Sequence, residues 1–320
     1  MSANFRAHLF LLTVNIIYGA NYIIAKGLMP EKIAPSGFIM LRVTGAVILF
    51  WTVFLIFKPS SEAGTDKSMI GRGTFAVRKS DLLRLFACGL FGVATNQLFF
   101  FNGLSLTSPI NAAIIMTSNP ILVLIISAII LKEAVNIKRV SGVILGAIGA
   151  VTLIMLSKND VSGFSSPLGD LFILVNSTSY AVYLVLVKPL MQRYHPLAVI
   201  SWVFLFGFAM VIPFGWTQLS EVQWSSFSNW DLFSAFYVVV ATTFLAYLLN
   251  ITALRTVAPT VASSYIYLQP VVAGISAWIF SFYLSEDYTS DFSILKLICA
   301  LLIFTGVYLV SRPVLKSIKP

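Results

Sequence analysis

The residues of this chain that could do chemistry are mostly neutral amides and tyrosines set within long apolar runs. They are Asn15, Tyr18, Tyr22, Gln97, Asn119, Asn176, Tyr180, Tyr183, Tyr247, Tyr265 and Gln269. One deep cation joins them: Arg42 lies about 9 Å inside its own apolar run by helix rise. Amides and phenols recognise amino, carboxyl and ring groups without a fixed charge, and a guanidinium can bind a carboxylate. These residue types predict a site that binds a small organic solute.

Each of these side chains also has a structural interpretation. Polar side chains can simply bond between membrane helices, where each bond contributes about 0.6 to 2 kcal/mol. Arg42 could bond to the backbone or extend toward the membrane interface instead of meeting a solute. The amides and tyrosines recur at corresponding places in the two halves of the chain, which favours a shared solute path.

Groups that catalyse reactions or hold metals are sparse. The two histidines, His8 and His195, lie at the ends of different apolar runs, and no cluster of His, Cys, Asp or Glu has the spacing of metal ligands. No Asp or Glu lies in the middle of a run, so the sequence contains no buried acidic proton relay of the usual kind. We therefore expect no enzymatic activity, no cofactor and no bound metal.

Two of the apolar runs carry an amide-proline pair at their centre, Asn119-Pro120 and Gln269-Pro270. Proline removes a backbone donor and clashes with the carbonyl four residues earlier, which costs about 3 kcal/mol in a soluble helix. We predict that Pro120 and Pro270 act as hinges and that the adjacent amides line a solute path. Bending for helix packing alone is the alternative.

Composition identifies the elements that must position these groups. The chain has 320 residues, of which 58% are hydrophobic and 10% charged, and its mean hydropathy is +0.91. Soluble domains carry roughly 25% charged residues, so this is a membrane protein. The net charge of +9 comes from basic residues in short loops between apolar runs, where positive charge sets orientation. A nucleic-acid partner is therefore not expected.

Because about 20 apolar residues cross a bilayer as a helix, the sequence predicts ten spans. They lie near residues 8–26, 36–57, 82–103, 109–131, 139–157, 168–188, 196–216, 231–253, 259–284 and 292–311. Most of the 21 basic residues fall on the side that holds both termini, which predicts cytoplasmic termini in a multi-pass protein of the cell membrane, the inner membrane in a bacterium. The longest loop, 58–81, is basic, cytoplasmic and too short to form a domain.

The chain contains a weak internal repeat. A shift of 150 residues aligns the two amide-proline pairs, and a shift of 161 residues aligns Asn15 with Asn176. The halves become 8–157 and 168–311, with five helices each. Since five is odd, the second half enters the membrane from the opposite side, and the fold class is an all-α membrane protein of two inverted five-helix repeats.

In these features the sequence resembles the EamA-type carriers of the drug/metabolite transporter superfamily. The resemblance rests on an NAA or VAS segment entering a helix, the polar-proline pair, an acid near that helix's end at Glu133, and a following span with Gly142, Gly146 and Gly149. It implies ten helices, a central cavity built mainly from helices one to four and six to nine, and alternating access without ATP. The second half departs from the pattern, because Tyr283 stands opposite Glu133.

We therefore expect a secondary carrier for a small organic metabolite, a neutral or aromatic amino acid or a related compound. A cavity with one deep cation suits such solutes better than nucleotide-type metabolites, whose phosphates favour several Lys or Arg. A channel or facilitative pore is the other alternative, although no selectivity ring is visible. The expected partners are the solute and the lipid bilayer; we expect a monomer, with a dimer through the glycine-rich span left open.

Overall fold

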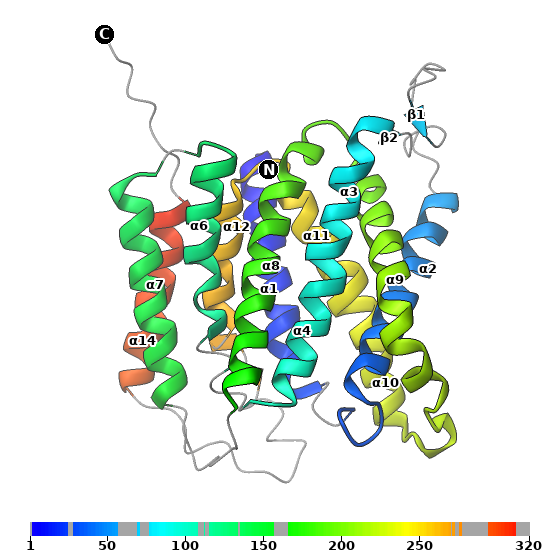
Figure 1. The fold of residues 1–320 in the computed structure, drawn as a ribbon. Coiled ribbons are helices and arrows are strands. Elements are labelled where there is room, and N and C mark those ends of the chain that lie inside the picture. Colours follow the sequence, from blue (N-terminus) through cyan, green and yellow to red (C-terminus); the bar gives the residue numbers. More distant parts are fainter. Residues whose placement is uncertain are drawn as a thin grey trace.

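The computed structural model describes residues 2–24, 28–56, 69–70, 77–107, 112, 115–133, 135–156, 166–269, 271–272, 275–276 and 294–311. These residues form a bundle whose long helices run up and down beside one another (Figure 1). The start of α1 and the end of α14 lie at the same end of the bundle, as the sequence predicts for the two termini.

The helices of the first half follow the predicted spans closely. They are α1 (Ala3–Ile24), α2 (Pro35–Ile56), α3 (Leu82–Gly89), the π-helix η3 (Leu90–Ala94), α4 (Thr95–Leu104), α6 (Asn119–Ile130) and α7 (Ile137–Leu156). The loop 58–81 lies mostly outside the described residues. Its described part holds a short antiparallel pair, β1 (Met69–Ile70) with β2 (Val77–Arg78), and the start of the turn η2 (Lys79–Asp81).

The second half repeats this order. Its helices are α8 (Pro167–Met191), α9 (Pro196–Ser220), η4 (Trp224–Ser226), α10 (Asn229–Tyr237), the π-helix η5 (Val238–Leu245), α11 (Ala246–Ala253), α12 (Pro259–Ser264), the 3-10 helix η6 (Tyr265–Leu268) and α14 (Ile294–Ser311). The all-helical prediction is confirmed.

Several helices are long and apolar enough to cross a membrane. The described residues contain five such segments, Pro35–Val53, Lys79–Leu104, Pro167–Met191, Pro196–Ser220 and Asn229–Ala253. Two shorter apolar helices, Asn119–Ile130 and Leu297–Ser311, stand beside them. A multi-pass membrane protein follows, and the full count of ten spans stays a prediction.

Close helix contacts repeat in the two halves. A Cβ added at Gly45 would lie 2.4 Å from Val239 Cγ1, and one added at Gly89 would lie 2.8 Å from Phe206 Cβ. The shifts of 161 and 150 residues carry Gly45 to Phe206 and Gly89 to Val239. The same contact therefore occurs twice with its two sides exchanged, as inverted repeats require. The boundaries 8–157 and 168–311 stay predictions.

The glycine-rich span packs inside the chain. A Cβ at Gly142 would lie 2.8 Å from the Gly306 carbonyl oxygen, and one at Gly149 would lie 2.9 Å from the Cys299 carbonyl oxygen, so α7 and α14 touch along their backbones. Gly146 accepts the ring of Tyr267, whose Cδ2 would be 2.4 Å from a Cβ. This face is thus occupied by small-residue helix packing within the chain.

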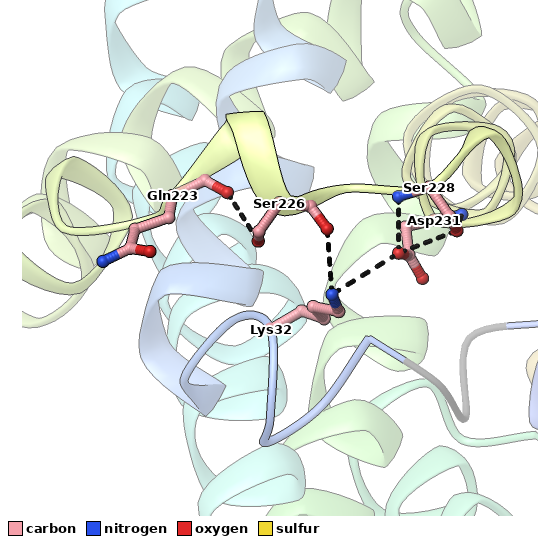
Figure 2. Close-up of polar contacts among 5 residues, drawn as sticks. All are labelled: Lys32, Gln223, Ser226, Ser228 and Asp231. Atoms are coloured by element: carbon pink, nitrogen blue, oxygen red, sulfur yellow. Dashed lines mark hydrogen bonds and ion pairs between the residues drawn. The ribbon is translucent and has the colours of Figure 1, made fainter.

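At the end of the bundle opposite the termini, two connections are tied together (Figure 2). Ser228 caps α10, and the Asp231 carboxylate accepts hydrogen bonds from the Ser228 backbone and hydroxyl at 2.9 Å each. Lys32, which precedes α2, donates to the Ser226 carbonyl at 3.0 Å and lies 3.8 Å from the Asp231 carboxylate. Two loops from different halves are held together by this contact.

Candidate functional site

Two π-helical segments, η3 and η5, interrupt corresponding spans of the two halves. The shift of 150 residues places Leu90–Ala94 within Val238–Leu245. A π-helix loosens the backbone hydrogen-bond ladder and is common at functional sites. One turn beyond these segments stand Gln97 and Tyr247, which the same shift relates to each other and whose side chains lie side by side.

Arg42 lies at the contact between α2 and η5. Its side chain is buried, with 6% of the residue exposed, and its Nε donates to Thr243 Oγ1 at 3.0 Å. Thr243 uses its own hydrogen on the Val238 carbonyl at 2.7 Å, so its oxygen is free to accept. The guanidinium carbon lies 5.1 Å from the ring centre of Phe101 and 5.8 Å from that of Phe38.

No carboxylate of the described residues pairs with this guanidinium. Aromatic faces attract a cation and offset part of its desolvation, but a buried charge normally also has a counter-ion. The geometry therefore presents a positive group prepared for an anion.

Tyrosines from two other helices lie near Arg42, and two tyrosines of α8 lie beside these. The hydroxyls of Tyr18 and Tyr247 both lie within electrostatic range of its charge. The ring centre of Tyr180 is 5.9 Å from that of Tyr183, and the Tyr180 hydroxyl accepts from Asn250 Nδ2 at 2.8 Å. Tyr18 and Tyr180 are each partly exposed.

Gly92 of η3 shapes this tyrosine cluster. A Cβ at Gly92 would lie 2.4 Å from Cδ2 of Tyr183, so the ring rests directly on the backbone. The Tyr247 hydroxyl approaches the Gly92 carbonyl at 3.4 Å. Any larger residue at this position would displace a fully buried ring.

Gln97 completes the cluster with an unusual feature. The residue is 3% exposed, and neither its amide nitrogen nor its amide oxygen has a well-formed hydrogen bond within the described part of the chain. Buried amides are nearly always paired. Its amide lies beside the Tyr247 hydroxyl and adds donor and acceptor groups to the cluster.

The other predicted amides form hydrogen bonds at helix contacts. Gln269 Nε2 donates to Asn15 Oδ1 at 3.0 Å, which joins the end of η6 to α1. Asn119 Nδ2 donates to the Ser177 carbonyl at 2.7 Å, which joins α6 to α8. Asn176 Nδ2 donates to the carbonyl of Asn96 at 2.7 Å. A solute contact for these four amides stays a prediction.

The remaining predicted residues lie elsewhere. The Tyr265 hydroxyl is 2.8 Å from His8 Nδ1, near the start of α1. Pro120 is the second residue of α6, and a turn at 117–118 precedes α6, so the helix is interrupted just before this proline. At this position the missing N–H costs no helical bond. Pro270 and the side chain of Tyr22 lie outside the described residues.

Sequence reasoning missed the aromatic and hydroxyl partners of Arg42. Phe38 stands one helical turn before Arg42, a signal that was available from spacing. Thr243 and Phe101 come from distant spans and become visible only in the fold.

Comparisons with known proteins agree with this architecture. The sequence matches the family described as "EamA-like transporter family" over residues 5–155 and again over 167–312. It is 26% identical to the "Uncharacterized transporter YyaM" of Bacillus subtilis (strain 168), with 94% of this chain and 92% of that protein covered. It is 29% identical over 138 residues to an "Uncharacterized transporter" of Archaeoglobus fulgidus, in an alignment that covers 43% of this chain and 48% of that protein.

A solved structure titled "Crystal structure of protein" superimposes with a TM-score of 0.70 at 16% identity. The superposition covers 95% of this chain and 96% of that chain, which shows a shared fold.

Proposed function

The chain belongs to the EamA-like transporter family, and on this premise we propose that it is a secondary carrier of neutral or aromatic amino acids or related carboxylates that works by alternating access. That it is a multi-pass membrane transporter follows from the family and its apolar helices. The solute class rests on one observation: Arg42 is buried among aromatic rings without a carboxylate partner among the described residues.

A solute carboxylate is the counter-ion that fits this arrangement. The guanidinium fork binds carboxylates through two parallel hydrogen bonds, and Nε is already used to hold the fork against Thr243. Phe38, Phe101 and the tyrosines supply apolar and ring surface beside it. A nucleotide-type solute would need several cations for its phosphates, whereas Arg42 is the one basic group whose charge reaches the described tyrosines of this cluster.

Alternating access is supported by the interrupted helices. The turn before α6 and the 3-10 helix η6 occupy corresponding places under the 150-residue shift, and such interruptions serve as hinges in carriers built from inverted repeats. We place both termini in the cytoplasm, the inner membrane being the location in a bacterium, because positive charge gathers at their side.

The solute class is tested with L-phenylalanine and two analogues that each lack one of its groups. 3-Phenylpropionate lacks the amino group, and phenethylamine lacks the carboxylate. For the purified wild-type protein in detergent, we expect the two carboxylates to raise the melting temperature and the amine to leave it unchanged. Arg42→Gln should weaken carboxylate binding by about 10- to 100-fold, as the loss of a charged hydrogen-bonded pair does. Stabilisation by phenethylamine equal to that by phenylalanine, or an Arg42→Gln protein that responds like the wild type, would make Arg42 a structural residue.

A further inference from the structure

Two buried amide oxygens, one on α6 and one on α8, have no donor among the described residues. Asn119 is fully buried and Asn176 is 2% exposed. Each uses its Nδ2 on a backbone carbonyl, of Ser177 and Asn96 respectively. The Oδ1 atoms of both have no hydrogen-bond partner within the described residues. Leaving a buried acceptor without a hydrogen bond is destabilising, so something beyond the described side chains is expected to satisfy the pair.

Ser177 connects the two asparagines. Asn119 bonds to the Ser177 carbonyl, and Asn176 directly precedes Ser177 in α8. The hydroxyl of Ser118 lies 3.3 Å from that of Ser177. We call the side-chain oxygens of Ser118, Asn119, Asn176 and Ser177 the oxygen cluster.

The backbone adds a further acceptor beside the oxygen cluster. Pro120 has no N–H, so the carbonyl of Met116 lacks the donor that a regular helix would supply. The interruption before α6 therefore leaves at least one backbone acceptor without its regular donor. Carriers with interrupted helices bind their coupling ions at such freed oxygens.

The second half of the chain shows what closes such a site. There the shifted equivalents of Asn119 and Asn176 are Gln269 and Asn15. Gln269 Nε2 reaches Asn15 Oδ1 at 3.0 Å and satisfies it. Asparagine is one methylene shorter than glutamine, and Asn119 bonds to the Ser177 carbonyl instead. The extra methylene group of glutamine thus allows the two amides of the second half to bond to each other, a closed pair, whereas the shorter Asn119 leaves the Asn176 oxygen unbonded among the described residues, an open pair.

From these contacts we propose that the oxygen cluster binds a monovalent alkali cation, with Na⁺ as the best fit. Hard cations take oxygen ligands such as amide carbonyls, hydroxyls and backbone carbonyls. Among the described residues, the hydrogen bonds of the oxygen cluster involve no carboxylate, and a divalent ion would need such charge. This inference rests on the proposed function only in that the chain is a membrane transporter. It does not depend on the solute class proposed above.

The oxygen cluster is linked to the tyrosine cluster that contains Gln97 and Tyr247. Asn176 holds the carbonyl of Asn96, and the next residue, Gln97, faces Tyr247. A cation bound to Asn176 would therefore lie close to Gln97 in the tyrosine cluster. Ion binding could then change the affinity of this cluster for a solute.

The first test uses the full-length wild-type protein in detergent. Its melting temperature is measured while NaCl or KCl replaces choline chloride at constant ionic strength. We expect a saturable rise with Na⁺, about 2 to 4 °C at about ten times the dissociation constant. A larger response to Na⁺ or K⁺ than to choline supports the cation site. Equal melting temperatures in all three salts would show that a buried water satisfies the oxygens and would overturn the proposal.

Matched variants locate the ion. Asn119→Gln copies the closed pair of the second half, so it should supply the missing donor to Asn176, abolish the Na⁺ response and keep the melting temperature in choline. The control Gln269→Asn should keep the response. An Asn119→Gln protein that responds like the wild type would move the ion elsewhere and contradict the site. If Asn119→Gln does not fold, Ser177→Ala takes its place, with a Na⁺ affinity at least several-fold weaker expected. Phenylalanine stabilisation measured in choline separates a failure here from a failure of the proposed function.

Discussion

Arg42 is the central residue of the proposed solute site, and the corresponding position in the second half holds a different residue type. The shift of 161 residues relates Arg42 to Val203, and the shift of 150 relates Thr243 to Val93. The hydrogen-bonded pair Arg42 and Thr243, at the contact of α2 with η5, thus corresponds to two fully buried valines in the other half. We infer that a solute binds asymmetrically, with its charged end toward α2.

Thr243 gives a residue-scale prediction with a built-in control. Thr242 and Thr243 are both fully buried and both donate to the Val238 carbonyl, at 2.6 and 2.7 Å, but only Thr243 accepts from Arg42. Thr243→Val should weaken carboxylate binding by about 3- to 10-fold, because Arg42 loses the bond that orients it. Thr242→Val should lose the same backbone bond without that effect. Equal dissociation constants for the two variants by ligand titration would argue against a positioning role.

Residue type and depth in the membrane were enough to select Arg42, Tyr18, Gln97 and Tyr247 as candidates, because a bilayer rejects unpaired polar groups and so marks them. Their contact with a solute stays a prediction. The pairing of the amides was not predictable. Whether Asn119 meets a solute or the Ser177 carbonyl depends on a few ångströms of helix position, which spacing along one chain does not contain.

At the scale of elements, interruptions fall at matched places in both halves. η3 and η5 interrupt one pair of spans, and the turn before α6 and η6 interrupt another. The prolines predicted the second pair, because a missing N–H disrupts a helix locally. The π-helices had no sequence signal, since an i to i+5 bond requires no particular residue. They result from packing of the whole bundle.

Pro120 permits an element-scale prediction. Pro120→Ala should let the helix continue through the turn at 117–118, so we expect transport turnover to fall more than equilibrium affinity if the interruption serves as a hinge. Pro213, an exposed proline inside α9, supplies the control, and Pro213→Ala should leave both quantities unchanged. The check is initial-rate transport beside ligand titration, and an unchanged rate for Pro120→Ala would assign this proline to packing alone.

At the scale of the whole molecule, polar contacts join distant segments at the ends of the bundle. Glu133 pairs with Arg139 at 2.6 Å and accepts from Thr260 of α12 at 2.9 Å. Asp81 accepts from Tyr194 at 2.6 Å and pairs with Arg193 at 3.0 Å. Under the proposed alternating access, contacts of this kind between the halves would have to loosen when their end of the bundle opens.

Orientation gives a prediction for the whole chain. Ser80, just before α3, and Ser225, in the connection between α9 and α10, are both exposed. These two connections lie at opposite ends of the bundle (Figure 1), and the native Cys88 and Cys299 are buried. Because positive charge marks the cytoplasmic side, an impermeant thiol reagent applied to intact cells should label Ser225→Cys and spare Ser80→Cys. The opposite labelling pattern would invert the topology.

The central claim, a carrier whose Arg42 binds a solute carboxylate, is tested most directly by counterflow in proteoliposomes. Vesicles loaded with unlabelled L-phenylalanine are placed in a trace of the radiolabelled amino acid. The wild-type protein should produce a transient accumulation of label above equilibrium, which Arg42→Gln abolishes, because only a site that alternates between the two sides exchanges solute in this way. Label entry that does not depend on the internal phenylalanine, or counterflow that persists unchanged in Arg42→Gln, would contradict the claim.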